Sequence, residues 1–157
     1  MSDSDPLVHV VALDLPRQPD LAAHYLATQL RIDKAVPWTP SPTSTGDAPE
    51  LRFSAAQGRV LSIRLLFDAA AAGTSVQPQL NLLVRMASVI DPSGAEEKKR
   101  PTRVALRWPG DKLPEFAGVI DSLSIQYAQM LADGTPVIAT AELHVREASR
   151  ASFRKNP

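Results

Sequence analysis

The sequence predicts a mainly β (α+β) fold, a split β-barrel or sandwich of about six or more antiparallel strands with one flanking α-helix. Three observations lead to this prediction. Several short stretches alternate apolar and polar residues, which is the period of a strand with one buried face. One stretch repeats apolar residues at helical spacing. A long hairpin is predicted over residues 116–147. A twisted sheet of this many strands tends to close into a barrel or to pack as a sandwich.

The first predicted element is a strand over residues 7–13, which are apolar, rich in β-branched side chains and followed by prolines. Residues 21–30 allow two interpretations, because their alanines favour a helix while an extended conformation is also compatible with the pattern. Residues 31–38 are predicted to be extended, since Val36 precedes a proline and is thereby biased toward β geometry.

A loop and two strands are predicted next. Residues 39–50 are rich in Pro, Ser, Thr and Gly, which is typical of a loop. Residues 51–53 predict a short strand and residues 59–67 a longer one. The longer strand places four alternating apolar side chains on one face. These are Leu61, Ile63, Leu65 and Phe67.

The predicted helix covers residues 75–90. Pro78 is compatible with it, because the first helical turn has no intrahelical partner for its N–H groups. A single apolar stripe runs along one side of this helix. Its members are Val76, Leu80, Leu83, Ala87 and Ile90. Residues 91–94 end the helix, and the mixed charges of residues 95–101 predict a solvated loop.

A strand over residues 102–108 and a turn at residues 109–111 precede the long hairpin. Each arm of the hairpin is expected to have about ten residues, against about five or six in a usual strand. Asp133 and Gly134 lie between the arms, where a tight turn requires a positive φ. The apolar face is expected to carry Val119, Leu123, Ile125 and Tyr127 from the first arm, and Val137, Ala139, Ala141, Leu143 and Val145 from the second.

Length and composition limit the possible functions. The 157 residues predict one domain, residues 1–150, with a polar tail over residues 151–157. Lys plus Arg and Asp plus Glu both number 17, so the basic excess typical of a nucleic-acid binder is absent. The sequence contains no cysteine, which excludes disulfides, thiol catalysis and cysteine-based zinc sites. It shows neither a signal sequence nor an apolar run of the length that a membrane span needs, so we expect assembly in the cytoplasm.

The sequence offers few candidates for catalysis. Its three histidines, His9, His24 and His144, have no partner at metal-ligand spacing. We expect His9 to be a core histidine and His144 to be a surface residue. Glycine loops that bind phosphate and nucleophile motifs are also missing. We therefore predict no catalytic, cofactor-binding or metal-ligating residues.

Three further residues call for an interpretation. Asp121 interrupts the apolar face of the first hairpin arm, and we expect it to be ion-paired or in a bulge. An enzyme that uses Asp121 with a histidine is the disfavoured alternative, because nothing in the sequence indicates acid–base geometry. Trp38 and Trp108 could form a stacking platform for single-stranded nucleic acid, but core packing is the better interpretation for a neutral chain.

Five stretches in order resemble the tube-type domain of contractile injection system proteins. They are residues 25–38 (YLATQLRIDKAVPW), 49–68 (PELRFSAAQGRVLSIRLLFD), 101–108 (PTRVALRW), 116–127 (FAGVIDSLSIQY) and 133–147 (DGTPVIATAELHVRE). The most specific parts are the LLFD end of residues 49–68 and the DGTP of the hairpin, which begins residues 133–147. Two departures stand out: Tyr25-Leu26-Ala27 replaces the usual Phe-Asn-Pro, and the chain ends at Pro157 without the LysM domain that often follows.

The resemblance implies an inner-tube-like split barrel that forms a hexameric ring at the junction of baseplate and inner tube, as a tube initiator or hub. The implied partners are copies of itself, inner-tube proteins and spike or baseplate proteins, within a phage-tail-like particle that can leave the cell as a whole. A LysM domain would have to come from another chain. The alternative is an adaptor or a cargo- or spike-loading chaperone that has the same barrel but does not join the ring.

Overall fold

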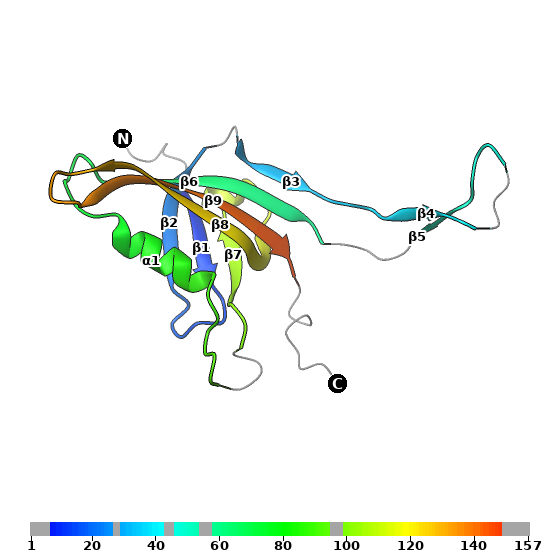
Figure 1. Cartoon of the computed structure of the whole chain (residues 1–157), viewed down its shortest axis with the longest axis horizontal. Coiled ribbons are helices and arrows are strands. Elements are labelled where there is room, and N and C mark those ends of the chain that lie inside the picture. Colours follow the sequence, from blue (N-terminus) through cyan, green and yellow to red (C-terminus); the bar gives the residue numbers. More distant parts are fainter. Residues whose placement is uncertain (1–6, 27–28, 43–45, 54–57, 95–98, 149–157) are drawn as a thin grey trace.

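The computed structural model describes residues 7–26, 29–42, 46–53, 58–94 and 99–148, with Asp111 described by its backbone alone. Seven antiparallel strands form one sheet in the order β2-β1-β7-β8-β9-β6-β3, and β2 also pairs with β6 (Figure 1). This extra pairing closes six of the strands into a barrel. The strands are β1 (Leu7–Ala12), β2 (Asp20–Tyr25), β3 (Arg31–Asp33), β6 (Val60–Asp68), β7 (Arg103–Arg107), β8 (Phe116–Met130) and β9 (Pro136–Glu147). The predicted mainly β fold with one helix is confirmed.

Strands β6 and β9 pair along the whole length of β6, from Val60 opposite Arg146 to Asp68 opposite Ile138. Both strands alternate between buried and partly exposed residues, as their sequences predict. Four predicted side chains of β6 and five of β9 are buried together. They are Leu61, Ile63, Leu65, Phe67, Val137, Ala139, Ala141, Leu143 and Val145.

The segment that allowed either helix or strand contains strand β2. Its residues pair with β1, and His24 and Tyr25 also lie opposite Leu66 and Leu65 of β6. These two pairings satisfy the backbone groups of β2, and they outweigh the helix propensity of the alanines. The barrel closes at this strand.

Helix α1 (Gln77–Met86) is shorter than the predicted residues 75–90. Val76, Leu80 and Leu83 are buried as expected, and Met86 joins them. The helix ends early because the following residues have other backbone partners. Val89 forms an isolated β-bridge with Pro101, and the N–H of Ile90 donates to the carbonyl of Arg100. Ala87 and Ile90 still pack partly against the core.

The predicted hairpin is confirmed, with longer arms of 15 and 12 residues in β8 and β9. Gly134 in its turn has φ +91°, as a tight turn requires. The predicted inward position of Val119 is wrong. Phe116, Gly118 and Ile120 are the buried residues at the start of β8, and the register then shifts between Ile120 and Ser122.

This shift is a β-bulge, in which Asp121 is the extra residue. A bulge changes which alternate residues face inward. Leu123 and Ile125, which lie beyond it, are therefore on the inner face as predicted and pack against the core. The predicted inward position of Tyr127 is wrong, since this residue is 45% exposed, so strict alternation is correct beyond the bulge for Leu123 and Ile125 alone.

The predicted loop over residues 39–50 is correct in part. Strands β4 (Trp38–Pro40) and β5 (Leu51–Phe53) form a separate two-stranded sheet, so Thr39 and Pro40 belong to a strand. Figure 1 shows this pair projecting away from the barrel, beyond β3. We call residues 34–42 and 46–53 the ribbon. The predicted tail, residues 151–157, lies outside the described residues.

Candidate functional site

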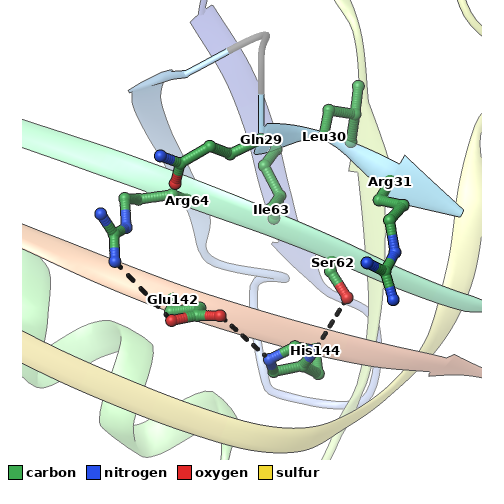
Figure 2. A pocket seen from close by; sticks show the side chains of 8 residues that line it. All are labelled: Gln29, Leu30, Arg31, Ser62, Ile63, Arg64, Glu142 and His144. Atoms are coloured by element: carbon green, nitrogen blue, oxygen red, sulfur yellow. Dashed lines mark hydrogen bonds and ion pairs between the residues drawn. The ribbon is translucent and has the colours of Figure 1, made fainter.

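The most enzyme-like group of side chains lies on the outer face of β6 and β9, in an open depression of about 520 Å³ (Figure 2). Ser62 Oγ is 2.8 Å from Nδ1 of His144, with which it forms a hydrogen bond. Nε2 of His144 is 3.4 Å from Oε1 of Glu142, and Glu142 Oε2 is 3.8 Å from Nη2 of Arg64. A serine, a histidine and a carboxylate in this order are the components of a hydrolytic triad.

The backbone at Ser62 takes part in two strand pairings. Ser62 lies opposite His144 of β9 on one side and opposite Arg31 of β3 on the other. A strand paired on both sides uses its N–H groups in those ladders, whereas an oxyanion site needs N–H groups that point at the reacting atom. Cross-strand hydrogen bonds of this kind stabilise the register of a sheet. The contacts of the group link β6 to β9, which favours a role in holding the two strands in register.

The other two histidines lie on the adjacent strands β1 and β2, where His9 is opposite Ala22 and His24 is opposite Leu7. His9 is half-exposed, and its Nδ1 is 3.0 Å from Oδ1 of Asp20 on the neighbouring strand, so the prediction of a core histidine is wrong. His24 lines a different depression together with Asp68. Among the described residues, no group of three His, Cys, Asp or Glu side chains is arranged to hold a metal ion.

Trp38 and Trp108, which were expected to pack in the core, have different environments. Trp108 is 6% exposed and meets the ring of Tyr25 edge-on at 5.2 Å between centroids, as expected. Trp38 is 53% exposed and contacts Phe53 within the ribbon, with 5.3 Å between ring centroids. The core prediction is therefore wrong for Trp38, because that residue lies on a segment that leaves the barrel.

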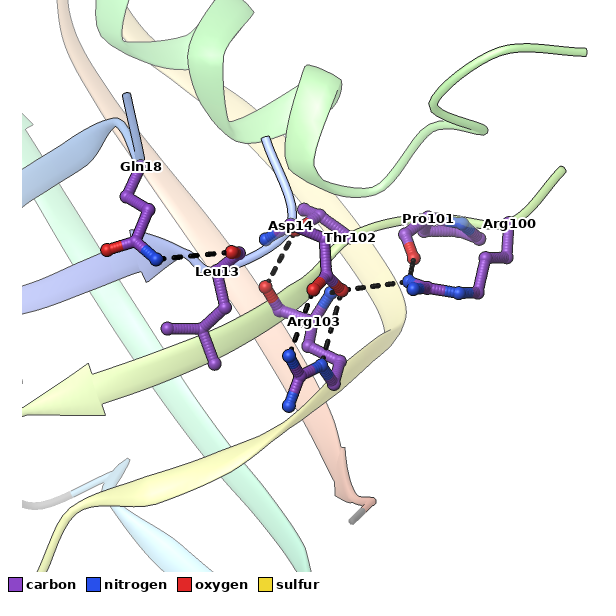
Figure 3. Close-up of polar contacts among 7 residues, drawn as sticks. All are labelled: Leu13, Asp14, Gln18, Arg100, Pro101, Thr102 and Arg103. Atoms are coloured by element: carbon purple, nitrogen blue, oxygen red, sulfur yellow. Dashed lines mark hydrogen bonds and ion pairs between the residues drawn. The ribbon is translucent and has the colours of Figure 1, made fainter. Parts of the chain in front are cut away.

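A partly buried ion-pair cluster surrounds Asp14 between β1 and the start of β7 (Figure 3). Its carboxylate accepts hydrogen bonds from the side chain and backbone N–H of Arg103 and from Arg100. Burial alone would raise the pKa of Asp14, but the bonds from Arg103 and Arg100 and the charge of Arg100 lower it from 3.8 to about 2. Arg100, which was predicted to lie in a solvated charge run, is therefore a structural residue.

Strand β8 has an open edge. It pairs with β9 from Gly118 to Met130 but with β7 only from Phe116 to Val119. In the part of the chain that the structure describes, no strand lies along its second edge beyond Val119. We call this stretch, residues 120–130, the free edge. Its length was visible in the sequence, but which edge would stay unpaired depends on the barrel topology.

The ribbon exposes several large apolar side chains. Val36, Trp38, Leu51 and Phe53 are each about half exposed, as is Ile32 at the base of the ribbon. Large apolar groups gathered on one projecting segment mark an interaction surface. In the sequence, the signal for this surface was the pair of apolar stretches on either side of the polar loop. The signal was missed because Trp38 was assigned to the core.

Comparison with known proteins agrees with a role in assembly. The family model of the contractile injection system tube protein matches residues 17–156, which is most of the chain. A search of curated proteins finds no match. None of the described helices has the length and apolar character needed to span a membrane.

Proposed function

This chain belongs to the contractile injection system tube protein family and is a structural subunit of such a particle, and from that premise we propose that its copies form a hexameric ring. The ring lies at the junction of baseplate and inner tube, between spike and tube, and acts as the tube initiator or hub. It assembles in the cytoplasm from copies of this chain together with inner-tube and spike or baseplate proteins. In this role the chain is not an enzyme.

The observation that carries the ring proposal is the free edge of β8. A long edge strand exposes unpaired N–H and C=O groups, and proteins that remain monomeric usually protect such edges with lysine, proline or a covering segment. Residues 116–130 contain neither Lys nor Pro, and their one charged residue is Asp121. Asp121 is itself neutralised by Arg146. The edge is therefore suited to pairing with another chain.

The ring also needs a second, different surface, because closed cyclic contacts are head-to-tail. The sheet supplies one at its other end. β3 is the last strand in the order and pairs with β6 alone, through three residue pairs. The ribbon continues from β3 on the same side. Each copy thus offers an acceptor edge on β8 and a projecting donor segment beyond β3.

The place at the baseplate end rests on the sequence resemblance of residues 25–147 to tube domains found there. The single predicted domain, residues 1–150 with a short tail, is part of this proposal. The competing role is that of an adaptor or loading chaperone that binds cargo or spike without joining a ring. The two roles differ in stoichiometry, because the adaptor would form a one-to-one complex and the ring subunit a closed homo-oligomer.

Two variants test the free edge with a matched control. Gln126 on β8 and Thr140 on β9 lie opposite each other, so lysine at either position adds the same charge to the same face. Of these two residues, Gln126 alone belongs to the free edge. We expect native mass spectrometry to show hexamers for the wild type and Thr140→Lys, and mainly monomers for Gln126→Lys. Hexamers of Gln126→Lys as stable as those of the wild type would exclude the free edge as the contact between ring subunits. One-to-one complexes with cargo, without any ring, would establish the adaptor role instead.

A further inference from the structure

The ribbon cannot be stable through its own contacts. Its two strands form three residue pairs, from Trp38 opposite Phe53 to Pro40 opposite Leu51. An isolated two-stranded hairpin is marginal in water even when it is longer. Trp38, Leu51 and Phe53 do not belong to the core cluster of the described residues. A second surface must therefore cover these side chains if the ribbon is to keep its shape.

The composition of the ribbon indicates a protein surface as the occupant. Lys34 and Arg52 balance Asp47 and Glu50, so the ribbon has no net charge. Nucleic acids and anionic membranes attract basic segments, and this segment is not basic. A tryptophan packed beside a second aromatic ring is instead typical of the centre of a protein interface. The ring proposed above provides the nearest such surface, a second copy of this chain.

The same chain carries an apolar surface at its other pole. Tyr127, Met130 and Leu131, which we call the hairpin tip, are exposed at the end of the β8–β9 hairpin. The hairpin tip adjoins the free edge of β8. Figure 1 shows the ribbon and the β8–β9 turn at opposite ends of the longest axis. A ribbon therefore cannot reach the hairpin tip of its own copy, although it can reach that of another copy.

We infer that the ribbon of one copy lies along the free edge of β8 in the next copy and buries Trp38 and Phe53 against its hairpin tip. Strand addition supplies backbone hydrogen bonds to the free edge, and the aromatic pair supplies apolar contact. One contact thus joins the two unpaired features of the fold. This inference rests on the proposed assembly and names the two surfaces that meet in it.

The absence of cysteine permits a direct test by disulfide cross-linking. Thr39→Cys places a thiol beside Trp38 on the ribbon, and Ala132→Cys places one beside Leu131, so the apolar side chains remain. The two single variants are purified, mixed and oxidised. We expect a covalent pair of one Thr39→Cys and one Ala132→Cys chain. As a control, Ser88→Cys, at an exposed position just after α1, replaces Ala132→Cys and should give at least tenfold less product.

Removal of the Trp38 ring should reduce the amount of cross-linked product, as the Ser88→Cys control does. Trp38→Ser added to Thr39→Cys should reduce the cross-linked product at least tenfold, while circular dichroism shows an unchanged fold. Hexamers by native mass spectrometry without any Thr39–Ala132 cross-link would overturn this inference and leave the ring intact. A specific cross-link in open chains that never close would support this contact and overturn the ring.

Discussion

Nη2 of Arg146 donates a hydrogen bond to Oδ2 of Asp121 at 3.2 Å, from β9 to the bulge of β8. Both side chains are about half exposed on the outer face of the barrel. The carboxylate that interrupts the apolar pattern of β8 is thus paired and bulged, as its sequence context predicts. Because Asp121 lies at the start of the free edge, removing this ion pair tests whether the pair contributes to folding stability or to assembly.

We predict that Asp121→Asn changes the free energy of unfolding by less than about 1 kcal/mol, since exposed ion pairs contribute little. Denaturant titration of wild type and variant measures the difference. Assembly should be unchanged, because the free edge pairs through its backbone. A variant that folds normally but fails to assemble would show that this carboxylate belongs to the interface.

Asp14 makes a contrasting prediction, because its ion pairs are more buried and shared between two arginines. Asp14→Asn should lower the free energy of unfolding by about 2 kcal/mol, which corresponds to the depression of its pKa. The same denaturant titration provides the measurement. A loss no larger than that for Asp121→Asn would contradict the structural role given to Asp14.

The pH dependence of this contribution has a defined sign. The pKa of Asp14 is lower in the folded state (about 2) than its ordinary 3.8, so the folded protein binds this proton less readily than the unfolded chain. The stabilisation is present above pH 3.8 and is lost as the pH falls toward 2. Thermal unfolding between pH 5 and pH 2 should therefore show a steeper loss for wild type than for Asp14→Asn. Parallel curves would contradict the pKa assignment.

Gly118 is predicted to tolerate no side chain. A Cβ at this position would overlap the carbonyl oxygen of Arg146, which is fixed backbone of β9. Gly118→Ala should destabilise the fold by about 2–3 kcal/mol. Gly46→Ala is the matched control, because the nearest atom there is 4.0 Å away. Equal midpoints of unfolding for the two variants would contradict the close approach of β8 and β9.

The two tryptophans should separate folding from assembly. Trp108→Ala removes a buried ring and should cost about 3–5 kcal/mol of stability. Trp38→Ala should leave the stability of the unassembled chain within about 0.5 kcal/mol of wild type. Chemical unfolding monitored by far-ultraviolet circular dichroism tests both. A large loss for Trp38→Ala would mean that the ribbon packs on its own barrel.

Local patterns predicted most of the fold. The alternation of Leu61, Ile63 and Leu65 is sufficient to place β6, and the turn chemistry of Gly134 is sufficient to place the hairpin. What local patterns could not decide was the choice between helix and strand at β2. That choice depends on β1 and β6, which are distant in sequence. Val119 was misplaced for a similar reason, because a bulge shifts the alternation by one residue.

The functional surface was less predictable than the fold. Trp38 has the composition of a core residue, and its exposure follows only from the path of the ribbon away from the barrel. The contact of Ser62 with His144 depends on the register of two strands that are far apart in the sequence. The free edge of β8, on which the proposed assembly rests, follows from the barrel topology, because local patterns do not show which edge of a strand stays unpaired.

Imaging of purified particles, at a resolution that identifies individual chains, would show whether this chain is a ring-forming subunit at the tube–baseplate junction. We expect a closed ring of six copies between spike and tube, with the ribbon of each copy lying on β8 of its neighbour. Particles that lack this chain, together with a strictly monomeric mass for the isolated protein, would contradict it.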